Sequence, residues 1–75
     1  MLGIDLNDHE SVYNLVRVKM SKNESLFLEE FTKLFLLEKN EDSMKIIYAV
    51  SLYDIKLARK LFNACMDKLA SFVAK

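Results

Sequence analysis

The most informative pattern of hydrophobic and polar positions lies in residues 44–74, where two apolar stripes follow one expected helix. One stripe repeats every seven residues, at Tyr48, Ile55, Phe62 and Leu69, and is called the seven-residue stripe. Ala58, Cys65 and Phe72 belong to it and follow its last three members at a distance of three residues. At about 100° per residue, a second stripe falls on the opposite face and contains Ile46, Val50, Tyr53, Leu57 and Leu61. One stripe can serve the core of the chain itself. The other therefore predicts a further helix, from this chain or from a partner.

Two shorter helices are expected before residue 44. Gly3 is the only glycine and the chain has no proline, so few residues interrupt helix. Asn7 and Glu10 have capping-box spacing and predict a helix over 8–20. Its expected apolar face consists of Val12, Leu15, Val16 and Met20. Ser21 and Glu24 repeat the spacing and predict a helix over 23–38, whose broad apolar face consists of Phe27, Leu28, Phe31, Leu34 and Phe35.

The third helix is expected over 44–74, after a polar loop at residues 39–43. Ser51 and Asp54 also have capping-box spacing, which would divide this helix in two. The seven-residue stripe crosses Asp54 without losing phase, however, and this favours one long helix. The sequence thus predicts a single all-α domain over residues 1–75. Its architecture is a small antiparallel three-helix bundle, or a four-helix bundle if the long helix breaks.

Composition adds a reason to expect association. The chain has 75 residues and is 52% hydrophobic, slightly above the roughly 45–50% usual for soluble domains. A domain this small buries only about 60–65% of the surface that its unfolded chain exposes. Surplus apolar surface therefore favours a homodimer or a complex with another helical protein. We expect the seven-residue stripe to form this contact, with its C-terminal half reaching toward the partner and the first half of the helix inside the bundle.

Charge modifies this picture locally but not globally. Eleven basic residues balance eleven acidic residues, so no overall field attracts nucleic acid or anionic lipid. The C-terminal half is basic, and the stripe has a basic edge formed by Lys56, Arg59 and Lys60. The function expected from these features is a small, non-enzymatic interaction or regulatory module. The competing structural interpretation covers both stripes within one compact bundle.

Candidate chemistry is sparse. His9 is the only histidine and Cys65 the only cysteine, and no recognisable metal-ligand set accompanies either of them. We therefore expect no catalytic residue, metal ligand or cofactor. One cysteine forms no intrachain disulfide, which suits the cytoplasm. The longest apolar run, residues 46–50, is far shorter than the roughly 20 residues of a membrane-spanning helix.

An alternative function depends on residues 13–20, which also alternate as a half-buried strand. Val16, Val18 and Met20 would face one side, and Arg17 and Lys19 the other. A strand here, followed by two helices, resembles the ribbon-helix-helix repressors. That resemblance implies a dimer whose paired strands enter the DNA major groove, with Arg17 and Lys19 contacting bases.

Overall fold

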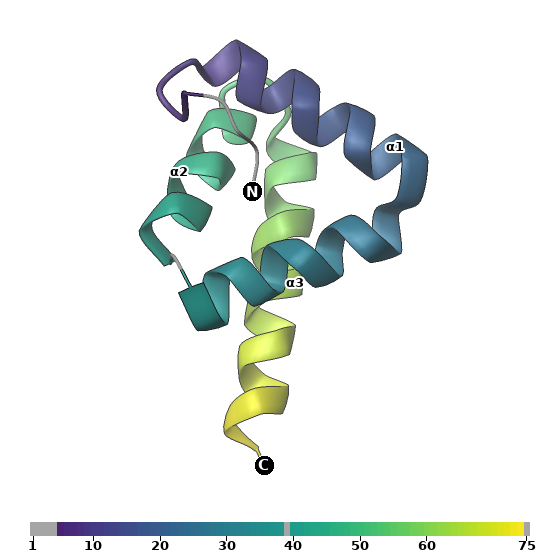
Figure 1. Ribbon diagram of the computed structural model, residues 1–75, viewed down its shortest axis with the longest axis vertical. Coiled ribbons are helices and arrows are strands. Elements are labelled where there is room, and N and C mark those ends of the chain that lie inside the picture. Colours follow the sequence, from purple (N-terminus) through teal and green to yellow (C-terminus); the bar gives the residue numbers. More distant parts are fainter. Residues whose placement is uncertain (1–4, 39, 75) are drawn as a thin grey trace.

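The computed structural model describes residues 5–38 and 40–74, except the side chain of Glu38, and the described residues contain no strand. Three α-helices pack together: α1 (His9–Lys33), α2 (Asn40–Ser51) and α3 (Ile55–Val73) (Figure 1). A π-helical turn, η1 (Leu34–Glu38), extends α1. The expectation of an all-helical chain is confirmed. The helix expected over 8–20 is confirmed and the alternative, a strand over 13–20, is wrong, because these residues are helical and bury Val16 and Met20 on one helical face.

Helix α1 begins close to the predicted position, but its N-cap is Asp8 and not Asn7. The Asp8 carboxylate accepts hydrogen bonds from the Ser11 backbone N–H at 3.3 Å and from the Ser11 hydroxyl at 2.7 Å. These bonds favour the ionised carboxylate and lower the pKa of Asp8. The predicted apolar face is confirmed, with Val12, Val16 and Met20 buried and Leu15 half-buried.

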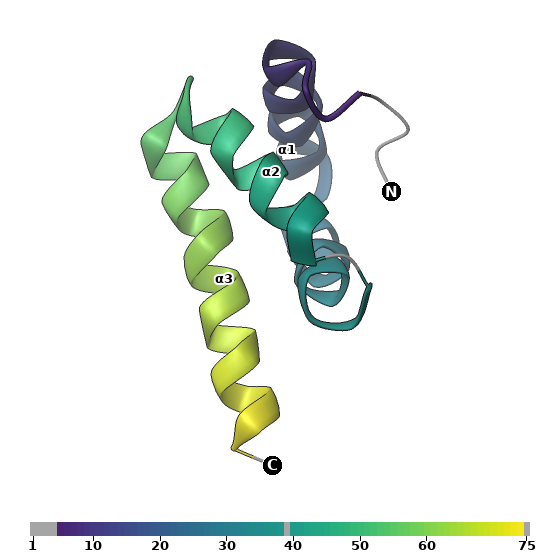
Figure 2. The same cartoon turned by 90° about the vertical axis from the view of Figure 1, so that its left-hand side faces the viewer.

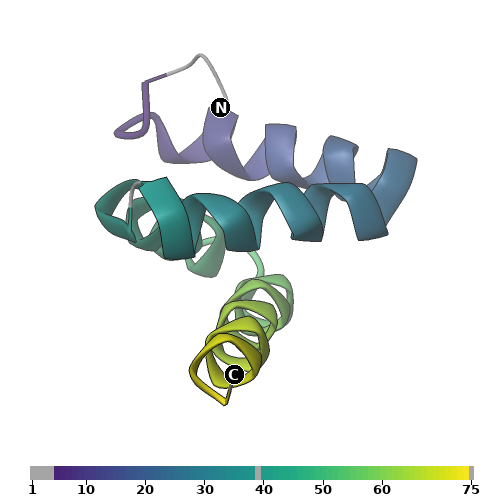
Figure 3. The same cartoon turned by 60° about the horizontal axis from the view of Figure 1, so that its bottom comes forward.

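A sharp bend at Asn23 divides α1 into a first arm, residues 9–22, and a second arm, residues 24–33. Asn23 has extended backbone angles, φ −158° and ψ 90°. Its side-chain oxygen accepts a hydrogen bond from the Leu26 backbone N–H at 3.1 Å and so caps the second arm. The second arm then runs back in the opposite direction, and the two arms diverge from the bend (Figure 1 and Figure 3). The predicted boundary is confirmed, although the capping residue is Asn23 and not Ser21.

The second arm and η1 deliver most of the aromatic core. The Phe27 and Phe31 rings stack with centroids 5.9 Å apart. The neighbouring residues Leu34 and Phe35 are both buried where the helix widens into the π-helical turn. The helix predicted over 23–38 therefore has the expected extent, but its last turn is π-helical.

The single helix expected over 44–74 is wrong, because the chain breaks between α2 and α3. The Ser51 hydroxyl donates to the Tyr48 carbonyl at 2.6 Å, and the Tyr53 N–H donates to the Val50 carbonyl at 3.0 Å. The Asp54 carboxylate then accepts the N–H groups of residues 56 and 57, both at 3.1 Å. These bonds satisfy backbone groups at a new helix start and turn the chain sharply.

Helix α2 also begins earlier than expected. It starts at Asn40, so residues 40–43 of the predicted loop are its first turn, and Lys39 lies outside the described residues. The core joins all three α-helices and η1 through the buried apolar residues Val12, Val16, Met20, Phe27, Phe31, Leu34, Phe35, Ile46, Ala49, Val50, Ala58, Leu61 and Cys65. The C-terminal half of α3 extends beyond the other helices (Figure 2).

Candidate functional site

The core-facing side of α3 consists of small or medium-sized residues. Ala58 is 2% exposed, and Leu61 and Cys65 are fully buried. Two residues assigned to the partner-binding stripe, Ala58 and Cys65, are therefore core residues of the chain itself. Their small side chains let α3 lie close to the helices that it covers. The assignment of these two residues to an interface with another molecule is wrong.

The large members of the seven-residue stripe are exposed. Ile55 is 54% exposed, Phe62 41% and Leu69 37%. Tyr48 is exposed too, but it lies on α2 beyond the break, with its ring edge-on to His9 at 5.4 Å between centroids. The structure therefore does not keep the stripe together as one face of one helix.

The exposed residues of α3 follow a different seam, which we call the α3 seam. It alternates steps of four and three residues and consists of Ile55, Arg59, Phe62, Met66, Leu69 and Val73. All are exposed except Met66, which is half-buried. At about 100° per residue, this seam is centred about 90° from the core-facing side of the same helix. Steps of four and three are the spacing with which one helix packs along another in a coiled coil.

Sequence reasoning found half of the α3 seam and missed the other half. The sequence pattern groups Ile55, Phe62 and Leu69 with the residues three positions after each, which are Ala58, Cys65 and Phe72. The companions in the seam are Arg59, Met66 and Val73, four residues after each, of which Arg59 and Val73 are exposed and Met66 is half-buried. The apolar Met66 and Val73 were a detectable signal. The sequence alone offered no criterion to choose between the two sets.

The basic edge has two different components. The Lys60 ammonium contacts the Glu24 carboxylate in α1 at 2.8 Å, so it ties α3 to the second arm within the chain. Among the described residues, Lys56 and Arg59 have no ion-pair partner, and both are exposed. Arg59 lies within the α3 seam and Lys56 beside it. These two cations therefore remain available to a binding partner.

Phe72 lines a small groove apart from the α3 seam. The groove has a volume of about 150 Å³ and lies between η1 and the C-terminal half of α3. Leu36 and Leu37 of η1 line it together with Phe72, and Glu29, Lys33 and Lys68 complete its rim. Leu37 and Phe72 are among the most exposed apolar residues described. The groove is thus a second apolar patch on the projecting half of α3.

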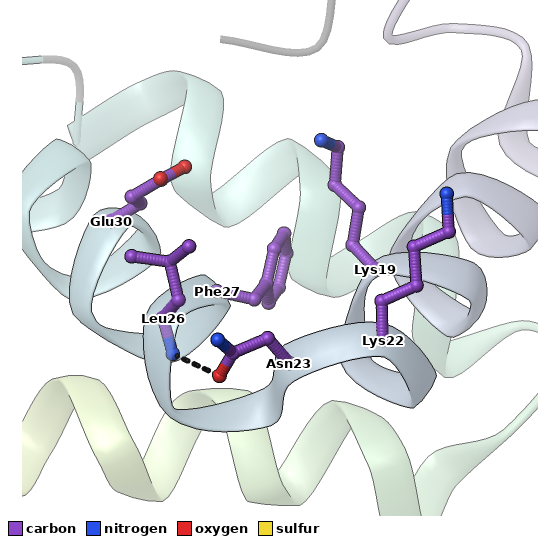
Figure 4. A pocket seen from close by; sticks show the side chains of 6 residues that line it. All are labelled: Lys19, Lys22, Asn23, Leu26, Phe27 and Glu30. Carbon is purple, nitrogen blue, oxygen red and sulfur yellow. Dashed lines mark hydrogen bonds between the residues drawn. The ribbon is translucent and has the colours of Figure 1, made fainter.

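A second pocket, of about 180 Å³, lies at the bend of α1. The Phe27 ring lies between Lys19 and Lys22 on one side and Leu26 and Glu30 on the other (Figure 4). Lys19 therefore lines this pocket, while Arg17 is two residues earlier on the helix, about 200° around its axis. The structure does not bring Arg17 and Lys19 onto one face, so the strand-borne pair of DNA-contacting residues is wrong.

The described residues offer little for catalysis or metal binding. They contain no group of three or more His, Cys, Asp or Glu side chains placed to hold a metal ion. Desolvation raises the pKa of the Cys65 thiol from 9.0 to about 11, so the thiol is protonated at neutral pH and is a poor nucleophile. None of the described helices has the length and apolar character needed to span a bilayer.

Comparisons with protein-family models, with curated proteins and with solved structures found no match for this chain.

Proposed function

We propose that this protein is a non-enzymatic interaction module that binds a helix along the α3 seam. The observation that carries the proposal is the exposed row of large apolar residues on α3, spaced as in a coiled coil. A different face of the same helix already packs in the core of the chain. Exposed apolar surface of this kind marks interaction sites on small proteins. The polar Arg59 and Lys56 give the surface a charged element that a partner would have to match.

Burial of the apolar side chains of the α3 seam would contribute substantially to the free energy of binding. A phenylalanine side chain has about 150–250 Å² to bury, so Phe62, at 41% exposed, retains roughly 80 Å² of accessible surface. Burying that surface is worth about 2 kcal/mol at 25 cal/mol per Å². Ile55, Leu69 and Val73 offer comparable contributions along the same line. A partner helix that covers the seam would therefore gain enough from apolar burial to bind specifically.

The non-enzymatic role and the cytoplasmic location are part of this proposal. A protonated, buried thiol and an isolated histidine give no general base or nucleophile with an orienting partner. The single cysteine suits a reducing compartment.

Site-specific photo-cross-linking tests the proposal. A benzophenone amino acid replaces Phe62 in one variant and Leu26 in the other, and both are irradiated in cells of the native host. Leu26 is a matched control because it is also an exposed apolar helical residue, on α1 and outside the seam. We expect discrete adducts from position 62 that are absent from position 26. Equal labelling from the two positions would contradict the proposal.

A further inference from the structure

We infer that the occupant of the α3 seam is the α3 seam of a second copy of this chain, in antiparallel orientation. This inference rests on the proposed function and specifies its partner. Three features of α3 support it: the place of Arg59 in the seam, the presence of an unpaired acid at the matching level, and the position of the helix bundle along α3.

Arg59 selects the antiparallel orientation. In a parallel pair of identical helices, equivalent seam positions face each other, so Arg59 of one copy would face Arg59 of the other inside an apolar contact. Two like charges held at that distance repel and lose their hydration. In an antiparallel pair, steps of four face steps of three, and Arg59 lies at the level of Leu69 of the second copy. The two arginines are then about 15 Å apart along the helix axis.

Asp67 supplies the matching charge. It is exposed and, within residues 5–38 and 40–74, it has no ion-pair partner. In the antiparallel arrangement that places Phe62 opposite Met66, Arg59 of one copy and Asp67 of the other come to nearly the same level on the same flank. Twofold symmetry repeats the pair at the other end of the contact. The surface of α3 is thus complementary in charge to its own inverted copy.

The shape of the molecule fits this arrangement. The other helices pack against one side of the first half of α3, and the second half projects beyond them (Figure 2). Antiparallel pairing places the projecting half of each α3 along the first half of the other, with the two bundles at opposite ends. Val73, at the end of the projecting half, then covers Ile55 of the second copy. The 19 residues of α3 provide about 28 Å of paired helix.

The area implies a reversible dimer. A standard specific interface buries about 800 Å² per partner, and a single helical seam of three heptads lies toward the lower end of that class. We therefore expect dissociation at micromolar protein concentrations.

Sedimentation velocity over a concentration series tests the self-pairing. The parent protein should sediment as a dimer at high concentration, and Phe62→Asp should weaken association by at least about 100-fold, since a carboxylate in a dry contact costs several kcal/mol. Leu69→Asp, farther from the bundle, should act in the same way and guards against misfolding of the first variant. The matched control Leu26→Asp should leave the dimer unchanged. A parent that remains monomeric at every concentration overturns the inference.

Disulfide trapping tests the orientation. Lys56 and Ala70 are exposed on one flank of the seam, where antiparallel pairing places residue 56 of one copy near residue 70 of the other. Lys56→Cys and Ala70→Cys should each form little intermolecular disulfide alone, whereas an oxidised mixture should give the mixed dimer. Parallel pairing would instead link each variant to itself. Native Cys65 is buried and serves as the unreactive background.

A charge exchange tests the proposed ion pair. Arg59→Asp and Asp67→Arg should each weaken the dimer, and the double variant should recover much of the loss. Two single losses that simply add in the double variant would contradict the pairing. If the parent is monomeric but position 62 cross-links to a different protein, the self-pairing fails while the proposed function stands. If position 62 forms no specific adduct at all, both fail.

Discussion

The two apolar sides of α3 differ in a way that contradicts a simple expectation from size. The core-facing side carries Ala58, Leu61 and Cys65, two of them small, while Ile55 and the large Phe62 remain exposed. Helix α3 lies where it does because small residues allow close approach to the other helices. Ile55 and Phe62 are placed where the described chain covers them only in part. Close packing, and not total hydrophobicity, therefore separates core from surface on this helix.

Of the changes that distinguish the two sides of α3, a charge on the core-facing side should have the largest effect on stability. Ala58→Glu should unfold the chain, because an unpaired buried carboxylate costs several kcal/mol. The whole stability of a 75-residue domain is only about 4–11 kcal/mol. Circular dichroism should show the loss of helix at 25 °C. Retention of native helix with an unchanged melting temperature would mean that Ala58 does not face the core.

Side-chain truncation should distinguish the two sides next. Leu61→Ala should lower the free energy of unfolding by about 2–5 kcal/mol, since it leaves a cavity in a fully buried position. Phe62→Ala, at the adjacent residue, should cost less, about 1–2 kcal/mol at a dilution where the monomer dominates, because two fifths of the ring is already exposed to solvent. Urea unfolding followed by circular dichroism measures both. Equal losses would remove the distinction between core and seam.

The cap at Asp54 should have a smaller effect. Asp54→Ala removes the acceptor for two backbone N–H groups at the start of α3 and should destabilise the fold by about 1 kcal/mol. Asp54→Asn keeps a capping acceptor and serves as the control. Thermal unfolding of the two variants should separate them, and identical melting temperatures would show that the break does not depend on this cap.

The last effect has no consequence at neutral pH and concerns the pH dependence contributed by Cys65. The pKa of the thiol is raised to about 11 by burial, whereas the unfolded chain releases the same proton near 9. The unfolded state is therefore favoured as pH rises, and the contribution of the thiol to stability is fully present below pH 9 and lost toward pH 11. Urea titrations across this range should show the decline in the parent and a shallower decline in Cys65→Ala. Parallel curves would place the thiol in water.

Much of the fold could be predicted from local patterns. The helical class, the apolar face of the first arm and the boundary near residues 21–24 all follow from periodicity and capping chemistry. The capping residues themselves were displaced by one or two positions, to Asp8 and Asn23. Competing Asn, Asp and Ser residues lie next to one another there, and only the geometry of the turn selects one.

The break before α3 shows where local patterns fail. The sequence contained two conflicting signals. The capping pair Ser51 and Asp54 indicated a break, and the seven-residue stripe, which continues through this segment, indicated one long helix. The stripe was the misleading one, because it joins exposed residues of two different helices, Tyr48 on α2 and Ile55, Phe62 and Leu69 on α3, and does not mark one continuous face. Once the chain turns, Tyr48 lies beside His9 and Ile55 lies on a different helix.

The sequence by itself determined that this chain is helical and that its C-terminal helix has more apolar surface than one contact needs. Only the tertiary structure decided which side of that helix is the core and which residues complete the exposed seam. Companions at three and at four residues are equally compatible with a repeat of seven. The choice between them depends on how closely α3 approaches α1 and α2, a property of packed helices that no single helix contains.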